Sequence, residues 1–166
     1  MNTQSVLREQ DYQRLTEAVS RLHRETSAKV VFLFDRNGQQ ITMQGATLGI
    51  DVTSFASLTA GNVAATEGLA KLVGENAFPA QYHEGVQNSI YIATLEKKAI
   101  LVVVFNEYSS VGLVRLRVKR AILELNKVYE DIAQKELLSS SQDENVEGFP
   151  SFGDISEEDI ENFFTS

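Results

Sequence analysis

Two segments of the chain are apolar at every position, and they restrict the fold more than any other feature. Residues 30–34 read VVFLF and residues 100–105 read ILVVVF. A strand with one face in water alternates apolar and polar side chains, whereas a strand covered on both faces is apolar throughout. We therefore expect a sheet with helices on both sides and with these two strands together in its centre.

The remaining patterns predict a single domain of mixed secondary structure. Helices are expected over residues 9–26, 53–74 and 110–136, and strands over 30–34, 40–44, 82–86, 90–95 and 100–105. Asn37-Gly38 tolerates the positive φ angles of a tight hairpin between the first two strands. The short connections favour antiparallel neighbours, so we predict an α+β fold with α/β/α layers.

The helix expected over residues 53–74 lacks the charged face of an ordinary surface helix. No charged residue occurs from Ser54 to Thr66. A helical wheel places the larger side chains on the side expected to face inward, namely Phe55, Leu58, Asn62, Leu69, Leu72 and Val73. It places a row of small residues on the opposite side, namely Ala56, Ala60, Ala64 and Gly68, with Ser57 and Gly61 beside them. We interpret this row as a protein–protein contact surface, the alternative being a helix buried within its own domain.

The net charge of −8 resides in the C-terminal part of the chain. Residues 139–166 hold eight of the 23 acidic residues and none of the 15 basic ones, so the rest of the chain carries equal numbers of both. A balanced body does not predict binding to nucleic acid or to an anionic membrane. The cluster Arg115, Arg117, Lys119 and Arg120 is therefore interpreted as a solvated face.

We divide the chain into a domain over residues 1–137, a flexible acidic linker over 138–154 and a docking helix over 155–166. Ser156 is a good N-cap for that helix. Its apolar residues fall at the hydrophobic-staple positions and on one face, and they are Ile155, Ile160, Phe163 and Phe164. A helix this short is marginal alone, which favours reversible docking on a partner over a merely solubilising tail.

The residues of known catalytic and metal-binding motifs are missing from the sequence. There is no cysteine, and His23 and His83 are the only histidines. Neither a Gly-x-Ser-x-Gly nucleophile elbow nor a phosphate-binding glycine loop occurs. We therefore expect no metal, no cofactor and no active site in this chain. The absence of a membrane-length apolar run and of a signal-peptide pattern favours a cytoplasmic protein.

Three segments of the sequence resemble the Roadblock / dynein light chain family. They are KVVFLFDRNGQQI, SFASLTAGNVAATEGLAKLVGE and ILVVVFNEYSSVGLVRLRVKRA, and the resemblance covers about residues 9–136. It is most specific to the bacterial members that act on small Ras-like GTPases of the MglA type, whose terminus the segment ISEEDIENFF also resembles. The resemblance implies a profilin-like fold, a five-stranded antiparallel sheet with one helix on one face and two on the other.

The resemblance also implies a function. Such proteins are homodimers whose central helices pair and face the GTPase. They stimulate GTP hydrolysis without supplying an arginine, by repositioning the switch loops, arginine and glutamine of the GTPase itself. The expected role is control of cell polarity and gliding motility in a bacterium, with the protein at a cell pole. The alternative is a scaffold of the same family that binds a GTPase or polarity proteins without activating hydrolysis.

The residues expected at the dimer and GTPase interface all lie on the central helix. They are Ala56, Ser57, Ala60, Gly61, Ala64, Glu67, Gly68 and Lys71. A second contact with the GTPase is expected from the C-terminal docking helix.

Overall fold

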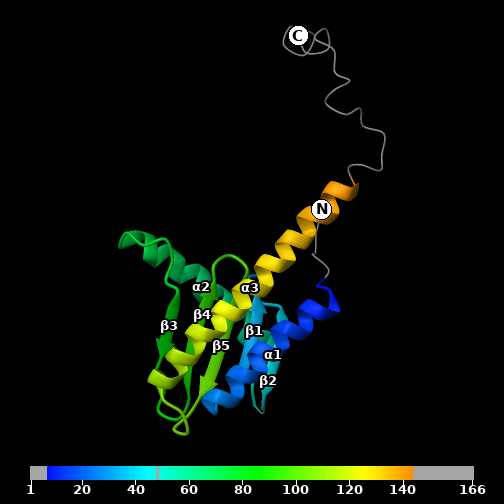
Figure 1. Ribbon diagram of the computed structural model, residues 1–166. Coiled ribbons are helices and arrows are strands. Elements are labelled where there is room, and N and C mark those ends of the chain that lie inside the picture. The colour runs from blue at the N-terminus through cyan, green and yellow to red at the C-terminus, as the bar shows by residue number, and fades with distance from the viewer. Residues whose placement is uncertain (1–6, 48, 144–166) are drawn as a thin grey trace, which may run out of the picture. The chain divides into compact units, whose positions relative to one another are not determined.

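A computed structural model describes residues 7–47 and 49–143 of the chain. Eight elements follow one another in the predicted order (Figure 1). They are α1 (Glu9–Thr26), β1 (Val30–Asp35), β2 (Gln40–Gly45), α2 (Val52–Leu72), β3 (Ala80–His83), β4 (Ser89–Leu95), β5 (Ala99–Phe105) and α3 (Val111–Asp143).

The five strands form one antiparallel sheet in the order β2-β1-β5-β4-β3. The two apolar strands lie side by side in the centre, where Phe32 of β1 is paired with Val102 of β5. β2 and β3 form the two edges. The expectation that the apolar strands would be central and residues 40–44 would be an edge is confirmed.

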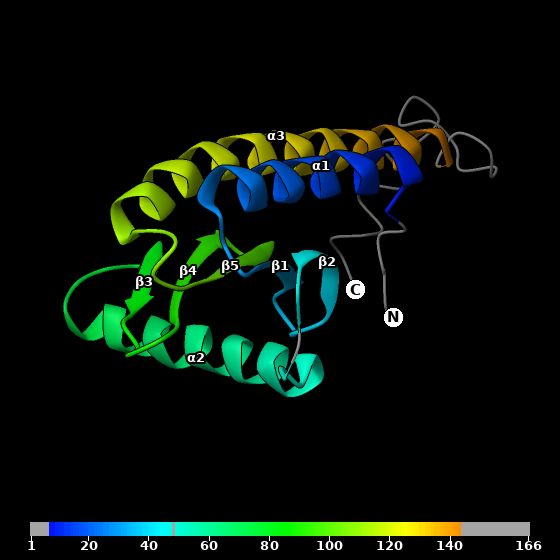
Figure 2. The same ribbon diagram turned by 90° about the horizontal axis from the view of Figure 1, so that it is seen from below.

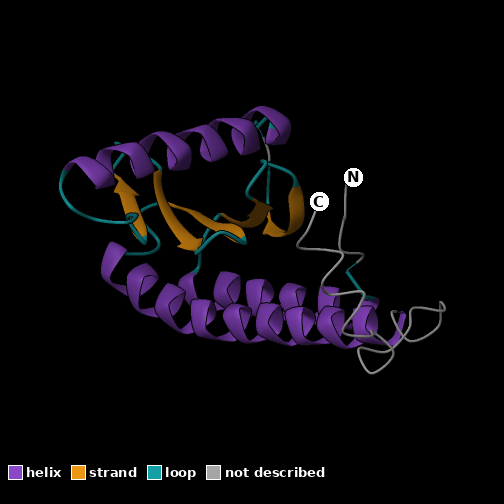
Figure 3. Ribbon diagram, turned by 90° about the horizontal axis from the view of Figure 1, so that it is seen from above, coloured by secondary structure: helices purple, strands orange, loops and turns teal. Residues whose placement is uncertain are grey.

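The helices form a layer on each face of the sheet. α2 covers one face, and α1 and the part of α3 up to Glu130 lie together on the other (Figures 2 and 3). Alternate strand residues face α2, so that Phe32, Phe34 and Val102 pack with Val63 in one core cluster. Because each central strand has a helix layer above and below, every residue of β5 is buried. The predicted three-layer α+β fold is confirmed.

The β1–β2 hairpin is the turn predicted from Asn37-Gly38. The Asp35 side chain accepts hydrogen bonds from the backbone N–H groups of Asn37 and Gln39, each at 2.9 Å. Gly38 has a φ of +83°, and a Cβ built on it would lie 2.9 Å from the backbone oxygen of Ala56 in α2. Glycine is therefore required here both for the turn and for the close approach of the hairpin to α2.

The first helix matches its predicted bounds but not every predicted side-chain position. The spacing of Tyr12, Leu15, Val19 and Leu22 predicts one apolar stripe. Leu15, Val19 and Leu22 are buried, whereas Tyr12 is 43% exposed. His23 is half-buried, because its imidazole packs against Gly45 at the end of β2.

Two element boundaries differ from the expected ones. β3 spans Ala80–His83 instead of 82–86, because the chain turns at Gly85, whose N–H donates to the Ser89 hydroxyl at 3.3 Å. α3 was expected to end near residue 136 and continues to Asp143. Three serine hydroxyls in this extension, from Ser139, Ser140 and Ser141, donate to backbone carbonyls three residues earlier. The first part of the predicted linker is therefore helical.

The chain consists of two units that divide within the last helix, after Glu130. The first unit contains the sheet, α1, α2 and the part of α3 up to Glu130. In the second unit the described residues are 131–143, which are helical. The predicted docking helix over 155–166 lies outside the described residues.

We predict that Gly38→Ala destabilises the protein more than Gly49→Ala does. Both glycines have positive φ, so each substitution costs about 1–2 kcal/mol for the left-handed backbone. Only Gly38 also has backbone atoms of α2 at 2.9–3.3 Å from the added methyl group; Gly49 has nothing within 4 Å. Urea denaturation at one fixed protein concentration compares the two free energies of unfolding. Equal losses would show that the hairpin is not tightly packed against α2.

Candidate partner-binding surface on helix α2

Helix α2 begins at a capped N-terminus, which fixes its start against the sheet. The N-cap is Asp51, whose side chain accepts from the Ser54 backbone N–H at 3.3 Å and from the Ser54 hydroxyl at 3.0 Å. These hydrogen bonds, that of the hydroxyl first, lower the pKa of the Asp51 carboxyl. Asp51, and not Thr53, is therefore the N-cap of α2.

The inward face of α2 is made of small and β-branched residues. Ala56, Val63 and Ala70 are buried, and the buried Thr59 hydroxyl donates to the Phe55 carbonyl oxygen at 2.7 Å. Phe55 packs its ring 5.4 Å from the ring of Phe32 in β1. Small side chains under the helix let its backbone lie close to the sheet.

The opposite side of α2, which we call the outer face, is apolar and uncovered. Leu58 is 74% exposed, Leu69 57% and Leu72 83%. The residues of the outer face are Leu58, Gly61, Ala65, Gly68, Leu69 and Leu72, all of them exposed. A monomeric protein rarely leaves several leucines exposed in one stripe, so this face has the character of a contact surface.

The sequence-based orientation of α2 is wrong by roughly a quarter of a turn. Leu58, Leu69 and Leu72, expected to face the sheet, point to solvent, whereas Ala56, expected on the surface, is 2% exposed. The physical reason is that α2 is apolar on both sides, so side-chain size alone cannot identify the side facing the sheet. The charge-free run from Ser54 to Thr66 identified the helix correctly, and part of the predicted outward row, Gly61, Ala64 and Gly68, is exposed.

The eight predicted interface residues are divided between the two sides of α2. Ser57, Gly61, Ala64, Gly68 and Lys71 are exposed, Ala60 and Glu67 are half-buried, and Ala56 is buried against the hairpin. Leu58, Ala65, Leu69 and Leu72 belong to the exposed surface and were not among the predicted interface residues. Hydropathy assigned the three leucines to the core, and no local signal in the sequence distinguishes the two sides.

Gly61 and Gly68 have no role in the packing of the residues that the structure describes. A Cβ added to either would have no atom within 4 Å, and neither has a positive φ. Glycine within a helix costs about 1 kcal/mol relative to alanine, so both positions destabilise α2 without a structural need. Close approach of a second molecule is one physical reason for glycine at such positions.

One ion pair joins α2 to the β1–β2 hairpin at the margin of this surface. The Arg36 guanidinium donates to the Glu67 carboxylate, and both side chains are about two-thirds or more buried. Lys71 is the one basic residue of α2. Because Arg36 is held by Glu67 within its own chain, it is not extended toward solvent.

The described residues include no group of three or more His, Asp or Glu side chains that could hold a metal ion. Burial, and to a lesser extent the charge of Asp35, raise the pKa of Tyr129 to about 12, so this phenol retains its proton near neutral pH. None of the described helices is long and apolar enough to cross a membrane.

The four predicted docking residues near the C-terminus are not placed by the structure. Ile155, Ile160, Phe163 and Phe164 lie outside the described residues. Their role in partner binding stays a prediction.

Comparisons with known proteins agree with the observed fold. A family model of the Roadblock/LC7 domain matches residues 15–105, which include all five strands and α2. A search of curated proteins found no match.

Three similar solved structures carry the name MglB, each with a TM-score of 0.72. MglB from Myxococcus xanthus is 50% identical, over 76% of this chain and 96% of that one. Gliding protein MglB from Thermus thermophilus is 34% identical, over 79% of this chain and 99% of that one. An MglB with a tetrameric arrangement is 33% identical, over 80% and 99%. Profilin II of Acanthamoeba castellanii, 12% identical with a TM-score of 0.50, shows a likeness of fold alone.

The family match covers more than half of the chain, and the similarity to MglB extends over about three-quarters of it. The predicted relationship is thereby confirmed: the chain belongs to the Roadblock/LC7 family, in which it is similar to MglB.

Proposed function

We propose that this protein is a homodimeric activator of a small Ras-like GTPase of the MglA type. The observation that carries the proposal is the outer face of α2, a charge-free apolar stripe with two glycines that the chain does not need for its own packing. Similarity to MglB supports a GTPase regulator as the class of protein.

The proposed dimer forms by packing two outer faces against each other. Burying an exposed leucine stabilises a contact by about 1.5–3 kcal/mol, and a two-fold symmetric interface buries each of Leu58, Leu69 and Leu72 twice. Gly61 and Gly68 would let the two helix backbones approach closely. A dimer of this kind presents the flanks of two α2 helices to the GTPase as one surface.

The proposed mechanism needs no catalytic group from this chain. GTP hydrolysis depends on positioning the attacking water and stabilising charge on the phosphate, and the GTPase can supply the reacting side chains itself. A regulator accelerates the reaction if it binds the catalytically competent conformation of the switch loops more tightly than the others. Arg36 is engaged with Glu67, which argues against its use as an inserted arginine.

The remaining parts of the proposal concern the C-terminal segment and the place of action. We propose that the segment with Phe163 and Phe164 binds the GTPase at a second site, connected through the residues after Asp143. In the cell the protein would act in the cytoplasm at one pole of a bacterium. Keeping the GTPase in its GDP form there would set cell polarity and direct gliding motility.

We predict that Gly68→Arg abolishes the dimer and leaves the fold intact. The substitution adds a large cation to the outer face, where its Cβ meets no atom of the chain. Charge burial in a close helix pair is costly, so the dimer dissociation constant should rise at least 100-fold, or about 2.7 kcal/mol. Sedimentation equilibrium measures the mass, and far-UV circular dichroism checks the fold.

The matched control for this variant is Gln13→Arg, which adds the same charge to an exposed position of α1. It should sediment as wild type does. A Gly68→Arg protein that keeps the wild-type mass would exclude α2 as the dimer interface.

We predict that the protein stimulates GTP hydrolysis by an MglA-type GTPase, and that a version ending at Asp143 retains the stimulation at saturating concentration. The truncation preserves all of α3, and the surface proposed to act on the switch loops is in α2. Phosphate release under single-turnover conditions gives the rate at each protein concentration. Loss of the C-terminal segment should raise the concentration needed for half-maximal stimulation.

Each other result of this assay has a defined meaning. Binding without stimulation by either protein would replace the activator with a scaffold of the same family. Stimulation by the full-length protein alone would assign the activity to the C-terminal segment rather than to α2.

A further inference from the structure

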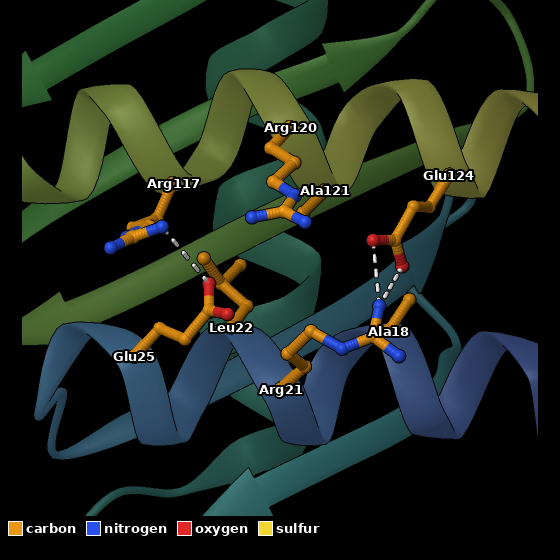
Figure 4. Close-up of a pocket in the computed structure, with 8 residues that line it drawn as sticks. All are labelled: Ala18, Arg21, Leu22, Glu25, Arg117, Arg120, Ala121 and Glu124. Atoms are coloured by element: carbon orange, nitrogen blue, oxygen red, sulfur yellow. Dashed lines mark hydrogen bonds and ion pairs between the residues drawn. The ribbon is translucent and has the colours of Figure 1, made fainter.

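The layer formed by α1 and α3 has a different chemistry from α2 and is not used by the proposed function. α1 and the part of α3 up to Glu130 run antiparallel along the sheet face opposite α2 (Figures 2 and 3). Two ion pairs join them: Arg21 contacts both carboxylate oxygens of Glu124 at 2.6 Å, and Arg117 lies 3.8 Å from Glu25 (Figure 4). These four residues form the ion pairs that connect the two helices.

Five further cations on the same layer form no ion pair or hydrogen bond with the residues that the structure describes. They are exposed, and they are Arg24, Arg115, Lys119, Arg120 and Lys127. Figure 4 shows the Arg120 guanidinium extending from α3 toward α1 between the two ion pairs without joining either. The adjoining Arg117 Nε is buried and has no hydrogen-bond acceptor. This layer therefore has more guanidinium and ammonium groups than carboxylates to pair with them.

Two exposed leucines lie on the same side of α3 as Lys119, Arg120 and Lys127. Leu116 is 62% exposed and Leu123 72%. They are seven residues apart, so they project from the same side of the helix two turns from each other. Lys119 and Lys127 follow them by three and four residues, which places each cation next to a leucine on the helix surface.

The surface beside this stripe is hollowed. A hollow of about 190 Å³ lies between α1 and α3. It is lined by three cations, Arg14, Arg21 and Lys127, by two carboxylates, Glu17 and Glu124, and by Ala18 and Val128. A hollow between two helices, lined by charges of both signs, fits an elongated segment better than a compact ligand.

We propose that the α1–α3 layer is a docking surface for an acidic amphipathic segment of a partner protein. Apolar side chains of the segment would pack on Leu116 and Leu123, and its carboxylates would pair with Arg115, Lys119 and Arg120. We infer an acidic amphipathic segment from complementarity: its carboxylates would pair with the exposed cations, and its apolar side chains would cover the exposed leucines.

The same features argue against two other anionic partners. A phosphate backbone offers no apolar groups to cover Leu116 and Leu123, which the apolar side of an amphipathic segment would cover. A membrane surface would need more apolar contact than two leucines provide. The surface lies on the sheet face opposite α2, so a dimer joined through α2 would leave two copies of it free.

The test measures binding of a labelled synthetic peptide to the full-length protein by fluorescence anisotropy. The peptide is long enough for about four helical turns, with leucine at positions i, i+3, i+4 and i+7 repeated and glutamate elsewhere. It should bind, and the charge-reversed double variant Lys119→Glu/Arg120→Glu should weaken binding at least tenfold. Raising the salt concentration should weaken binding to the wild-type protein, because exposed ion pairs are screened.

Matched controls make the result specific to this surface. Lys97→Glu/Lys98→Glu makes the same charge change in the exposed β4–β5 turn and should alter affinity less than twofold. A peptide with lysine in place of glutamate should not bind. The proposal is overturned if the acidic peptide fails to bind, if a scrambled peptide of equal charge binds as tightly, or if double-stranded DNA or phosphatidylglycerol vesicles bind more tightly. No GTPase enters this assay, so its failure is independent of that of the proposed function.

Discussion

Coverage of the two central strands is the constraint from which the rest of this structure follows. β1 and β5 are apolar on both faces, so the sheet is stable only with a helix layer on each side. The described residues supply three helices for that purpose: α1 and α3 cover one face and α2 covers the other alone. No described element of the first unit covers α2 in turn. Its outer leucines are exposed because the layers of a single chain end there.

A feature of this molecule could be predicted from the sequence when the residues that determine it lie close together in the chain. The central position of the two apolar strands, the Asn37-Gly38 hairpin and the three layers followed from apolar runs and turn residues, and all are confirmed. The exposed side of α2 followed only in part, because Leu58 and Ala56 lie on opposite sides of a helix that carries apolar residues on both. Its orientation is set by close packing on Phe32, Phe34 and the hairpin, which are distant in sequence. The ends of β3 and α3 were missed because a serine-rich segment and a short loop have weak local preferences.

The two helical surfaces of the first unit differ in the interactions they offer. The outer face of α2 is uncharged and apolar, which suits a close and lasting contact between like surfaces. The α1–α3 layer has surplus cations around two leucines, which suits a weaker contact that depends on charge and salt. A protein with these properties can join a regulator dimer on one side to a separate partner on the other. Neither contact requires catalytic residues in this chain.

Disulfide trapping tests most directly whether the outer face of α2 packs against its equivalent in a second copy, which is the central claim. The chain contains no cysteine, so Ala65→Cys introduces a single thiol on that face. Under mild oxidation this variant should form a covalent dimer rapidly and nearly completely, whereas Lys98→Cys, exposed in the β4–β5 turn, should remain largely monomeric. Equal and slow cross-linking of both variants would show that α2 does not meet a second α2, and the proposed dimer would be wrong.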